Sequence, residues 1–188
     1  MTKENSLALE YHDMPKVRQI GIVVADIEEA MKQYSRLMNA STWYRVKVAE
    51  TEVYYRSRKI ELELDLVLAY SGKTQLELIK VISGERNIYS DFLKEYAKGG
   101  IHHLGFLVND FDKRLARMQT MGMEVLQHGI ITSQGKAITK FAYFDTVPDT
   151  GYIIEIIETK LKGIPVSQSR MMMELGVLTG DVNKIKLT

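Results

Sequence analysis

The sequence contains one segment twice. Residues 19–30 read QIGIVVADIEEA, and residues 103–114 read HLGFLVNDFDKR. In both copies a polar residue able to bind a metal precedes an apolar residue and a glycine, and an aspartate opens an acidic segment with helical spacing. An internal duplication restricts the architecture before any single residue is interpreted, because each copy should fold as one structural unit.

Hydrophobic periodicity assigns the same order of elements to both copies, β-α-β-β-β, which gives an α+β fold class. Asp26 and Asp110 stand where a helix N-cap is expected. The first copy is predicted to contain a strand over 17–24, a helix over 26–38, extended chain over 42–48 and 52–57, and strands over 60–70 and 74–81. The second is predicted to contain strands over 101–108, 123–128, 140–144 and 152–157, and a helix over 110–121.

These elements divide the chain into four parts. Residues 16–90 and 99–160 form the two units, and a short helix over 89–96 lies at the junction between them. Residues 1–15 are an N-terminal extension, and residues 161–188 are a C-terminal extension that includes an apolar segment of helical tendency over 169–175. We expect the C-terminal extension to pack on the body or on a partner subunit.

Composition excludes several classes of function. The chain of 188 residues has a net charge of +1, which gives no electrostatic case for nucleic acid or an anionic membrane as a partner. It has no cysteine, which excludes disulfides, zinc–thiolate sites and cysteine nucleophiles. The first residues lack the apolar core of a signal peptide, and no stretch reaches membrane-spanning length, so a cytoplasmic protein is the default expectation.

The repeat also places four potential metal ligands at corresponding positions. Gln19 and His103 begin the two copies, and a glutamate between aliphatic residues follows each copy, Glu77 in LEL and Glu155 in IEI. Three oxygen donors and one imidazole nitrogen suit a divalent ion that accepts six ligands, such as Mn, Co, Ni, Mg or Zn. The alternative is structural, because a strand carboxylate usually faces solvent and a pair of adjacent histidines is a weak metal signal.

The repeated unit resembles the vicinal oxygen chelate superfamily, which includes glyoxalase I and methylmalonyl-CoA epimerase. The resemblance extends from about residue 17 to residue 158. It is most specific in three stretches, GGIHHLGFLVNDFD at 99–112, TQLELI at 74–79 and AYFDTVPDTGYIIEII at 142–157. It implies two curved sheets that face each other around a metal cleft, with Gln19, Glu77, His103 and Glu155 as the ligands. Gln19 departs from the epimerase pattern, in which histidine is usual.

The resemblance implies a metal-dependent isomerase or epimerase. The reaction it implies is proton transfer α to a carbonyl through a metal-stabilised enolate, on a small acyl-CoA-like substrate, with the divalent ion as the cofactor. Two alternatives stay open, a glyoxalase I-type lyase that acts on a thiol hemithioacetal and a metal-free small-molecule binding or resistance protein. A homodimer is expected.

The catalytic base is sought among the carboxylates. Glu77 and Glu155 qualify if either loosens from the metal. The alternating segment 60–70 offers Glu63 and Asp65, which qualify only if their face of the strand points into the cleft. Aligned with the epimerase pattern, Asp65 falls near a catalytic carboxylate.

Overall fold

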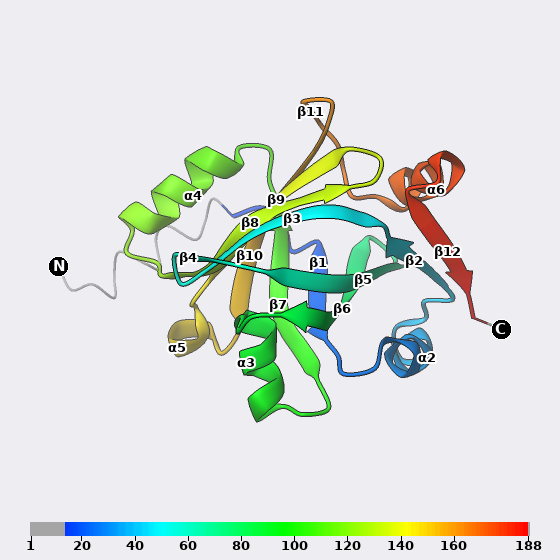
Figure 1. The fold of residues 1–188 in the computed structure, drawn as a ribbon, viewed down its shortest axis with the longest axis horizontal. Coiled ribbons are helices and arrows are strands. Elements are labelled where there is room, and N and C mark those ends of the chain that lie inside the picture. Colours follow the sequence, from blue (N-terminus) through cyan, green and yellow to red (C-terminus); the bar gives the residue numbers. More distant parts are fainter. Residues whose placement is uncertain (1–13, 188) are drawn as a thin grey trace.

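The two copies of the repeat form two matching halves of one curled mixed sheet in the computed structural model, which describes residues 14–187 (Figure 1). The first copy comprises β1 (Gln19–Val23), α2 (Ile27–Met38), β2 (Thr42–Val46), β5 (Leu62–Ser71) and β6 (Thr74–Gly84). The second comprises β7 (Gly100–Leu107), α4 (Phe111–Thr120), β8 (Val125–Ser133), β9 (Ala137–Phe144) and β10 (Ile153–Leu161). The α+β fold class and the tandem β-α-β-β-β units are therefore confirmed.

The strand order shows the symmetry of the repeat. Over residues 14–187 the sheet has twelve strands, in the order β12-β2-β5-β6-β1-β7-β10-β9-β8-β3-β4, with β11 (Ile164–Pro165) paired to β10. The run β2-β5-β6-β1 is repeated in reverse as β7-β10-β9-β8. Within each copy the first and last strands pair in parallel, β1 with β6 and β7 with β10. The copies join through the antiparallel pair β1–β7.

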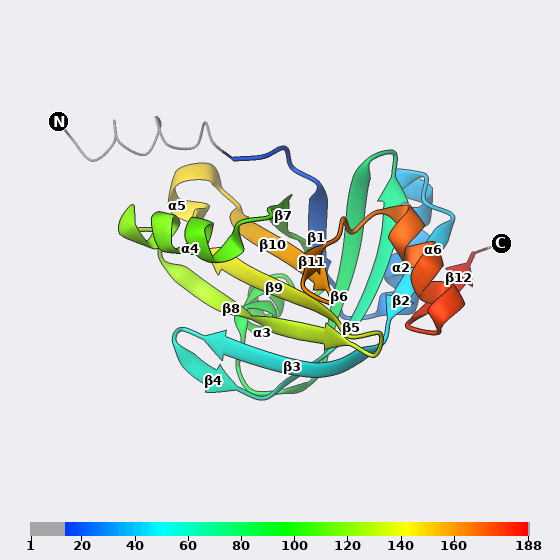
Figure 2. The same ribbon diagram turned by 90° about the horizontal axis from the view of Figure 1, so that it is seen from above.

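A hairpin that the periodicity did not predict connects the far edges of the two halves. β3 (Val48–Tyr55) and β4 (Arg58–Ile60) lie between β2 and β5 in the chain. The chain bends at Lys47, so that β2 pairs with β5 of its own copy while β3 pairs with β8 of the other copy. Figure 2 shows β3 running from β2 across to the outer side of β8. The sheet therefore curls into a half-barrel with a concave inner face.

Side-chain alternation separates the inner from the outer face of the sheet. Ile22 and Leu78 point outward into a core under α2, and Phe144 and Ile156 point outward into a second core under α4. The residues between them point inward, where Val23, Leu64, Ile79 and Phe141 belong to the core of the half-barrel. Gln19, Gly21 and Glu77 alternate with the outward residues of their strands and so share this inner face.

The two repeated aspartates differ as helix caps. The Asp26 side chain accepts a hydrogen bond of 2.9 Å from the Glu29 backbone N–H and caps α2. Asp110 occupies the same position before α4 but makes no such bond, and it contacts Arg114 Nε at 3.3 Å instead. Both aspartates therefore occupy the predicted N-cap positions, and only Asp26 caps its helix through the side chain.

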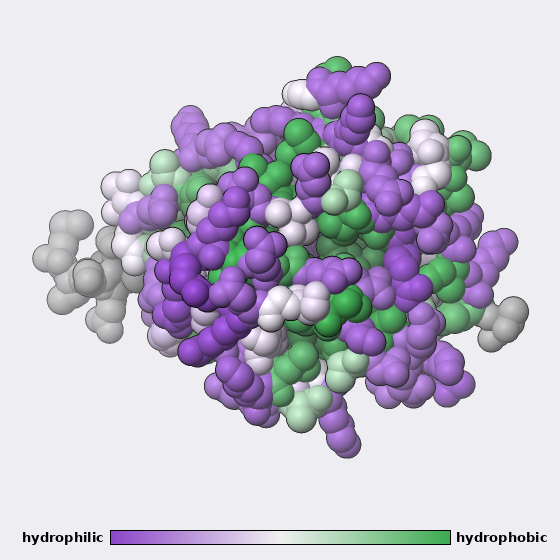
Figure 3. Space-filling model, in the orientation of Figure 1, coloured by the Kyte–Doolittle hydropathy of each residue, from purple (hydrophilic) through white to green (hydrophobic). Residues whose placement is uncertain are grey.

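The remaining elements lie at the ends of the half-barrel. α3 (Ile88–Glu95) connects the two copies, and the short α5 (Val147–Thr150) precedes β10. α6 (Arg170–Thr179) follows β11, and β12 (Val182–Lys186) pairs with β2 at one edge of the sheet. Apolar surface is visible over α6 at the upper right of Figure 3. Met171 and Leu178 of this helix are largely exposed.

Of the predicted N-terminal extension, residues 1–13 lie outside the described part of the chain. None of the helices within residues 14–187 combines the length and the apolar character needed to cross a membrane.

Candidate metal centre

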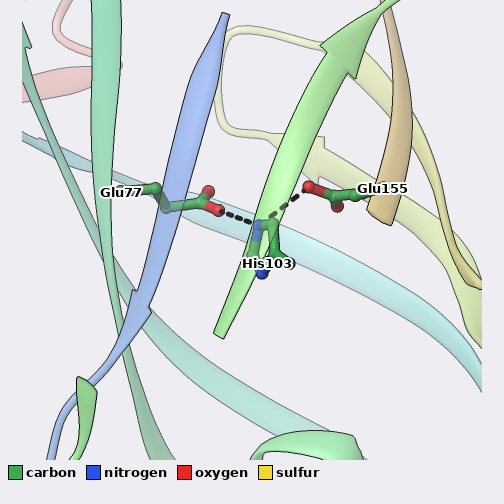
Figure 4. A group of neighbouring side chains, drawn as sticks. All are labelled: Glu77, His103 and Glu155. Carbon is green, nitrogen blue, oxygen red and sulfur yellow. Dashed lines mark ion pairs between the residues drawn. The ribbon is translucent and has the colours of Figure 1, made fainter. Parts of the chain in front are cut away.

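Three of the four predicted ligands meet on the inner face of the sheet. Glu77 on β6, His103 on β7 and Glu155 on β10 each offer a donor atom within 4.8 Å of the others. His103 Nε2 lies 3.0 Å from Glu155 Oε2 and 3.8 Å from Glu77 Oε2. Figure 4 shows the two carboxylates reaching toward the imidazole from opposite sides.

The glycines of the repeat create the space for these side chains. Gly21 lies beside Glu77 in the β1–β6 register and beside His103 in the β1–β7 register. A Cβ at Gly21 would lie 1.8 Å from His103 Cε1, and a Cβ at Gly105 would lie 2.5 Å from Gln19 Oε1. Each glycine thus makes room for the polar side chain that begins the other copy, which gives the repeated polar-apolar-glycine pattern a physical reason.

Gln19 joins the group from β1 and has a defined hydrogen bond. Its side chain is buried, and Nε2 donates to Gln75 Oε1 over 2.8 Å. Oε1 has no hydrogen-bond partner. Oε1 lies against Gly105, and Gly105 pairs with Glu155 in the β7–β10 register. The unpartnered oxygen of Gln19 therefore faces the cluster.

Both histidines of the adjacent pair face inward. The β1–β7 register shifts by one residue beside His102, and both imidazole rings contact Tyr143. His102 Nδ1 and His103 Nδ1 are 3.0 Å apart, at hydrogen-bond distance. Regular alternation along a strand would direct one of two adjacent histidines outward, and the register shift is what allows both to face inward. Because Nδ1 of His103 is occupied, Nε2 is the nitrogen available to a further ligand.

The buried atoms without partners fit a cation. Gln19 Oε1, His103 Nε2 and Glu155 Oε2 are all buried side-chain atoms without a hydrogen bond of good geometry, and the last two face each other at 3.0 Å. Such atoms are uncommon in folded proteins and call for an explanation. An amide oxygen, an imidazole nitrogen and a carboxylate oxygen are all donors to divalent ions, and Glu77 adds a second carboxylate. A divalent metal is a group that these residues can hold.

Burial dominates the electrostatics of the cluster. It raises the pKa of Glu155 to about 8, although a hydrogen bond from Tyr143 opposes the shift. Burial also raises the pKa of Glu77, and the neighbouring charge of Glu155 adds to that shift. Burial lowers the pKa of His103 to about 3, which leaves the imidazole neutral. A cation between the carboxylates would favour their ionised forms.

Asp65 does not belong to this group. It alternates with Leu64 and Leu66, which point into the half-barrel, so it lies on the outer face. There its Oδ1 is 3.0 Å from Arg45 Nε, and Arg45 also contacts Glu28 of α2. Glu63 shares that outer face and accepts a hydrogen bond from Ser83. Asp65 and Glu63 therefore do not face the cleft, which was the condition for either to serve as the base.

Sequence reasoning missed the residues that support the cluster. Gln75 is two residues from Glu77 on the same strand and faces the same side. The alternation of the strand could therefore have identified it as an inner-face residue. Tyr89 and Tyr143 hydroxyls are 2.9 Å apart in the buried interior, beside the cluster. Both tyrosines, Tyr89 in α3 and Tyr143 in β9, were absent from the predicted ligands and bases, because an aromatic residue in a helix or strand normally indicates core packing.

Two cavities lie on different sides of the cluster. One, of about 600 Å³, is lined by His102, Phe92 and Tyr55, among others. The other, of about 430 Å³, is lined by Leu68 and Gln168, among others. None of the four candidate ligands lines either cavity. The first cavity neighbours the cluster through His102, which contacts His103 Nδ1, and the second neighbours it through Leu68, which pairs with Glu77.

A half-barrel built from two β-α-β-β-β units around an inner-face cluster of donors is the architecture of one superfamily. The family model described as "Glyoxalase/Bleomycin resistance protein/Dioxygenase superfamily" matches residues 18–143. The chain belongs to this family, also known as the vicinal oxygen chelate superfamily.

Solved structures agree on the fold. Methylmalonyl-CoA epimerase from Mycobacterium tuberculosis is 17% identical, with a TM-score of 0.54 over 79% of this chain and 91% of that one. The hypothetical protein BH1468 from Bacillus halodurans C-125 is 19% identical, with a TM-score of 0.53 over 78% and 95%. A variant of Streptomyces coelicolor methylmalonyl-CoA epimerase, in complex with 2-nitronate-propionyl-CoA, is 17% identical, with a TM-score of 0.51 over 77% and 97%. A search of curated proteins finds no significant match.

The shifted pKa of Glu155 predicts that metal-free protein loses stability as the pH rises from 6.5 to 8. An acid whose folded-state pKa lies above its ordinary value of 4.5 stabilises the fold at low pH, and this stability is lost as the pH approaches about 8. The lowered pKa of His103 affects stability only below about pH 6.5. In the presence of a chelator, Tm should fall across this range, and Glu155→Gln should reduce the fall. Glu63→Gln, on the outer face, is the control, and equal slopes in parent and Glu155→Gln would contradict the prediction.

Proposed function

We propose that this protein is a metal-dependent isomerase that moves a proton at the carbon next to a carbonyl, in the manner of an epimerase of acyl-CoA-like compounds. The observation that supports it most is the convergence of Glu77, His103 and Glu155, with the unpartnered oxygen of Gln19 beside them. The residues would bind Co, Ni, Mn, Zn or Mg, and the donor set does not select among these ions. When bound, the ion would polarise the substrate carbonyl and make the adjacent C–H bond more acidic.

The two glutamates differ in their surroundings, which suggests different roles. The Glu155 side chain is 4% exposed, lies 3.0 Å from His103 Nε2 and receives a hydrogen bond from Tyr143. The Glu77 side chain is 14% exposed and lies 3.8 Å from the same nitrogen. We therefore assign Glu155 as the fixed ligand and Glu77 as the carboxylate that exchanges a proton with substrate. A base works best when its pKa lies near the working pH, and burial moves the pKa of Glu77 upward in that direction.

His103 and Gln19 would hold the ion rather than transfer protons. The lowered pKa of His103 keeps its imidazole neutral, as a ligand nitrogen must be, and the contact with His102 directs Nε2 to the carboxylates. Gln19 contributes a neutral oxygen, so its removal should weaken binding less than removal of either glutamate.

The assembly we propose is a homodimer. Met171, Leu175 and Leu178 expose apolar surface along one side of α6, and they are 75%, 46% and 84% exposed. Exposed apolar surface of this kind is a common feature of subunit contacts.

The function is tested by proton exchange in deuterated water. Protein loaded with Co²⁺ should introduce deuterium at the α-carbon of a 2-substituted acyl-CoA, because Glu77 removes and returns that proton. Glu77→Gln should lower the exchange rate at least about 100-fold, which is the contribution typical of a positioned acid or base. Asp65→Asn, on the outer face, is the matched control and should exchange at the parent rate. The readout is NMR of the α-position with and without chelator.

The outcome separates the proposal from its two alternatives. Turnover of a hemithioacetal without exchange into any acyl-CoA would replace the epimerase with a glyoxalase-type lyase. Absence of turnover and exchange, together with tight binding of a small molecule by metal-free protein, would replace it with a binding protein.

A further inference from the structure

The C-terminal segment covers one end of the half-barrel and forms one wall of an open, mainly apolar cavity of about 430 Å³. Val46, Leu68 and Ile131 line it from the sheet, and Val166, Met172 and Met173 line it from the C-terminal segment. Small-molecule sites in proteins usually have volumes of roughly 300–1,000 Å³ and walls of this mainly apolar kind. The cavity thus has the size and the surface of a ligand site.

Two residues that line the cavity, Leu68 and Gln168, neighbour the candidate metal centre, although none of the four candidate ligands lines the cavity itself. Leu68 is the cross-strand partner of Glu77, and both side chains point to the inner face. Gln168 lines the cavity as well, and its backbone oxygen accepts a hydrogen bond of 3.2 Å from Gln75, the residue that binds Gln19. A ligand in the cavity would therefore lie one residue away, across Leu68, from the Glu77 carboxylate to which we assign proton transfer.

The larger cavity is less suited to the reacting group. It meets the cluster through His102, which contacts His103 at Nδ1. The metal-facing Nε2 is directed away from it, toward Glu155 and Glu77. A substrate in that cavity would approach behind the imidazole ring and not from the carboxylate side.

We propose that the cavity under α6 binds an apolar substituent of the substrate, so that the substrate is an acyl compound with a bulky aliphatic or aromatic group. This inference rests on the proposed function. The apolar walls favour a hydrocarbon group, and Met172 and Met173 can adapt to its shape because methionine is unbranched and flexible. Lys162 and Asp181, of opposite charge, also line the cavity, which gives no cationic surface for the phosphates of a CoA group.

The test replaces one small residue that lines the cavity with a larger side chain that fills it. Ala137 lines the cavity and shares the inner face with Thr139. Ala137→Phe should weaken binding of N-phenyl-1-naphthylamine, an uncharged fluorescent probe, at least tenfold. Leu37→Phe adds the same ring outside the cavity, at an exposed position of α2, and should leave binding unchanged. Ala137→Leu provides a milder filling, and the Tm of each variant reports whether it folds.

The probe experiment needs no metal, so it can fail separately from the proposed function. Saturable binding that falls in Ala137→Phe but not in Leu37→Phe supports the cavity even if no proton exchange is found. Absence of saturable binding to the parent, or equal binding by folded variants, would overturn it. In the exchange assay, KM should fall as the 2-substituent grows in the parent, and this trend should be lost in Ala137→Phe.

An independent observation concerns the orientation of the Gln19 amide. A backbone oxygen only accepts hydrogen bonds, so the group of Gln75 that faces Gln168 O must be the donor Nε2. Nε2 of Gln75 also donates to Tyr70 Oη over 3.0 Å. Gln75 Oε1 is then directed to Gln19 and accepts from Nε2 of Gln19. The remaining atom of the Gln19 amide, Oε1, must face the cluster.

We infer that Gln75 is a positioning residue that presents an oxygen, and not an NH₂ group, to the metal. An NH₂ group has no lone pair to offer a cation, whereas the amide oxygen is a ligand. The contact also links the C-terminal segment to the candidate centre, because the chain of hydrogen bonds starts at Gln168. This inference, too, rests on the proposed metal site.

A double-mutant cycle distinguishes orientation from general stability. Gln75→Met removes all three side-chain hydrogen bonds of Gln75 with little change of shape and should weaken Co²⁺ binding at least about tenfold, as is usual for partners of metal ligands. In a Gln19→Glu background the same change should cost less than about threefold, because both carboxylate oxygens can bind the ion. The readouts are Co²⁺ affinity by competition with a chelator and the absorption spectrum of bound Co²⁺.

Equal losses in the two backgrounds, or no loss in either, would overturn the positioning role. A parent protein that binds no Co²⁺ would overturn the metal site itself, and the positioning role with it.

Discussion

The antiparallel pairing of β1 with β7 is the contact on which the candidate centre depends. It brings the two copies of the repeat together at Gly21 and Gly105, and each glycine accommodates a polar side chain from the other copy. The parallel neighbours of these strands then place Glu77 and Glu155 on either side of His103. A side chain at either glycine would overlap the imidazole or the amide, so the pairing and the cluster require each other.

The cluster is costly to the fold unless something binds there. Several polar groups lie in an interior that otherwise contains aliphatic and aromatic side chains, and burial raises the pKa of both carboxyl groups. A buried polar atom without a partner typically costs about 1–3 kcal/mol. Natural sequences often accept such a cost at functional sites, because the same unpaired donors are what a ligand recognises. The unpartnered atoms of Gln19, His103 and Glu155 are best understood in this way.

Much of the fold and of the cluster could be predicted from sequence, because the repeat and the alternation are local signals. Gln19, Glu77, His103 and Glu155 were chosen as corresponding positions of a duplication, and a duplicated unit places corresponding residues symmetrically. The face on which Asp65 lies was harder to predict. Alternation shows that the two faces of a strand differ but not which of them is inside. The ion pair of Asp65 with Arg45 places Asp65 on the outer face. The inward turn of His102 depends on a register shift between strands, and the β3–β8 pairing joins segments distant in sequence. Neither the register shift nor the β3–β8 pairing produces a pattern in the local sequence.

The most direct test of the account is the metal stoichiometry of purified protein after equilibrium dialysis against Co²⁺, measured by elemental analysis. We expect one ion per chain in the parent and in His128→Ala, because His128 stacks on Tyr54 and is not among the clustered donors. His103→Ala should retain less than a tenth of that amount, since it removes the only nitrogen donor of the cluster. Equal stoichiometry in the parent and in His103→Ala would contradict the central claim that these residues form a metal site.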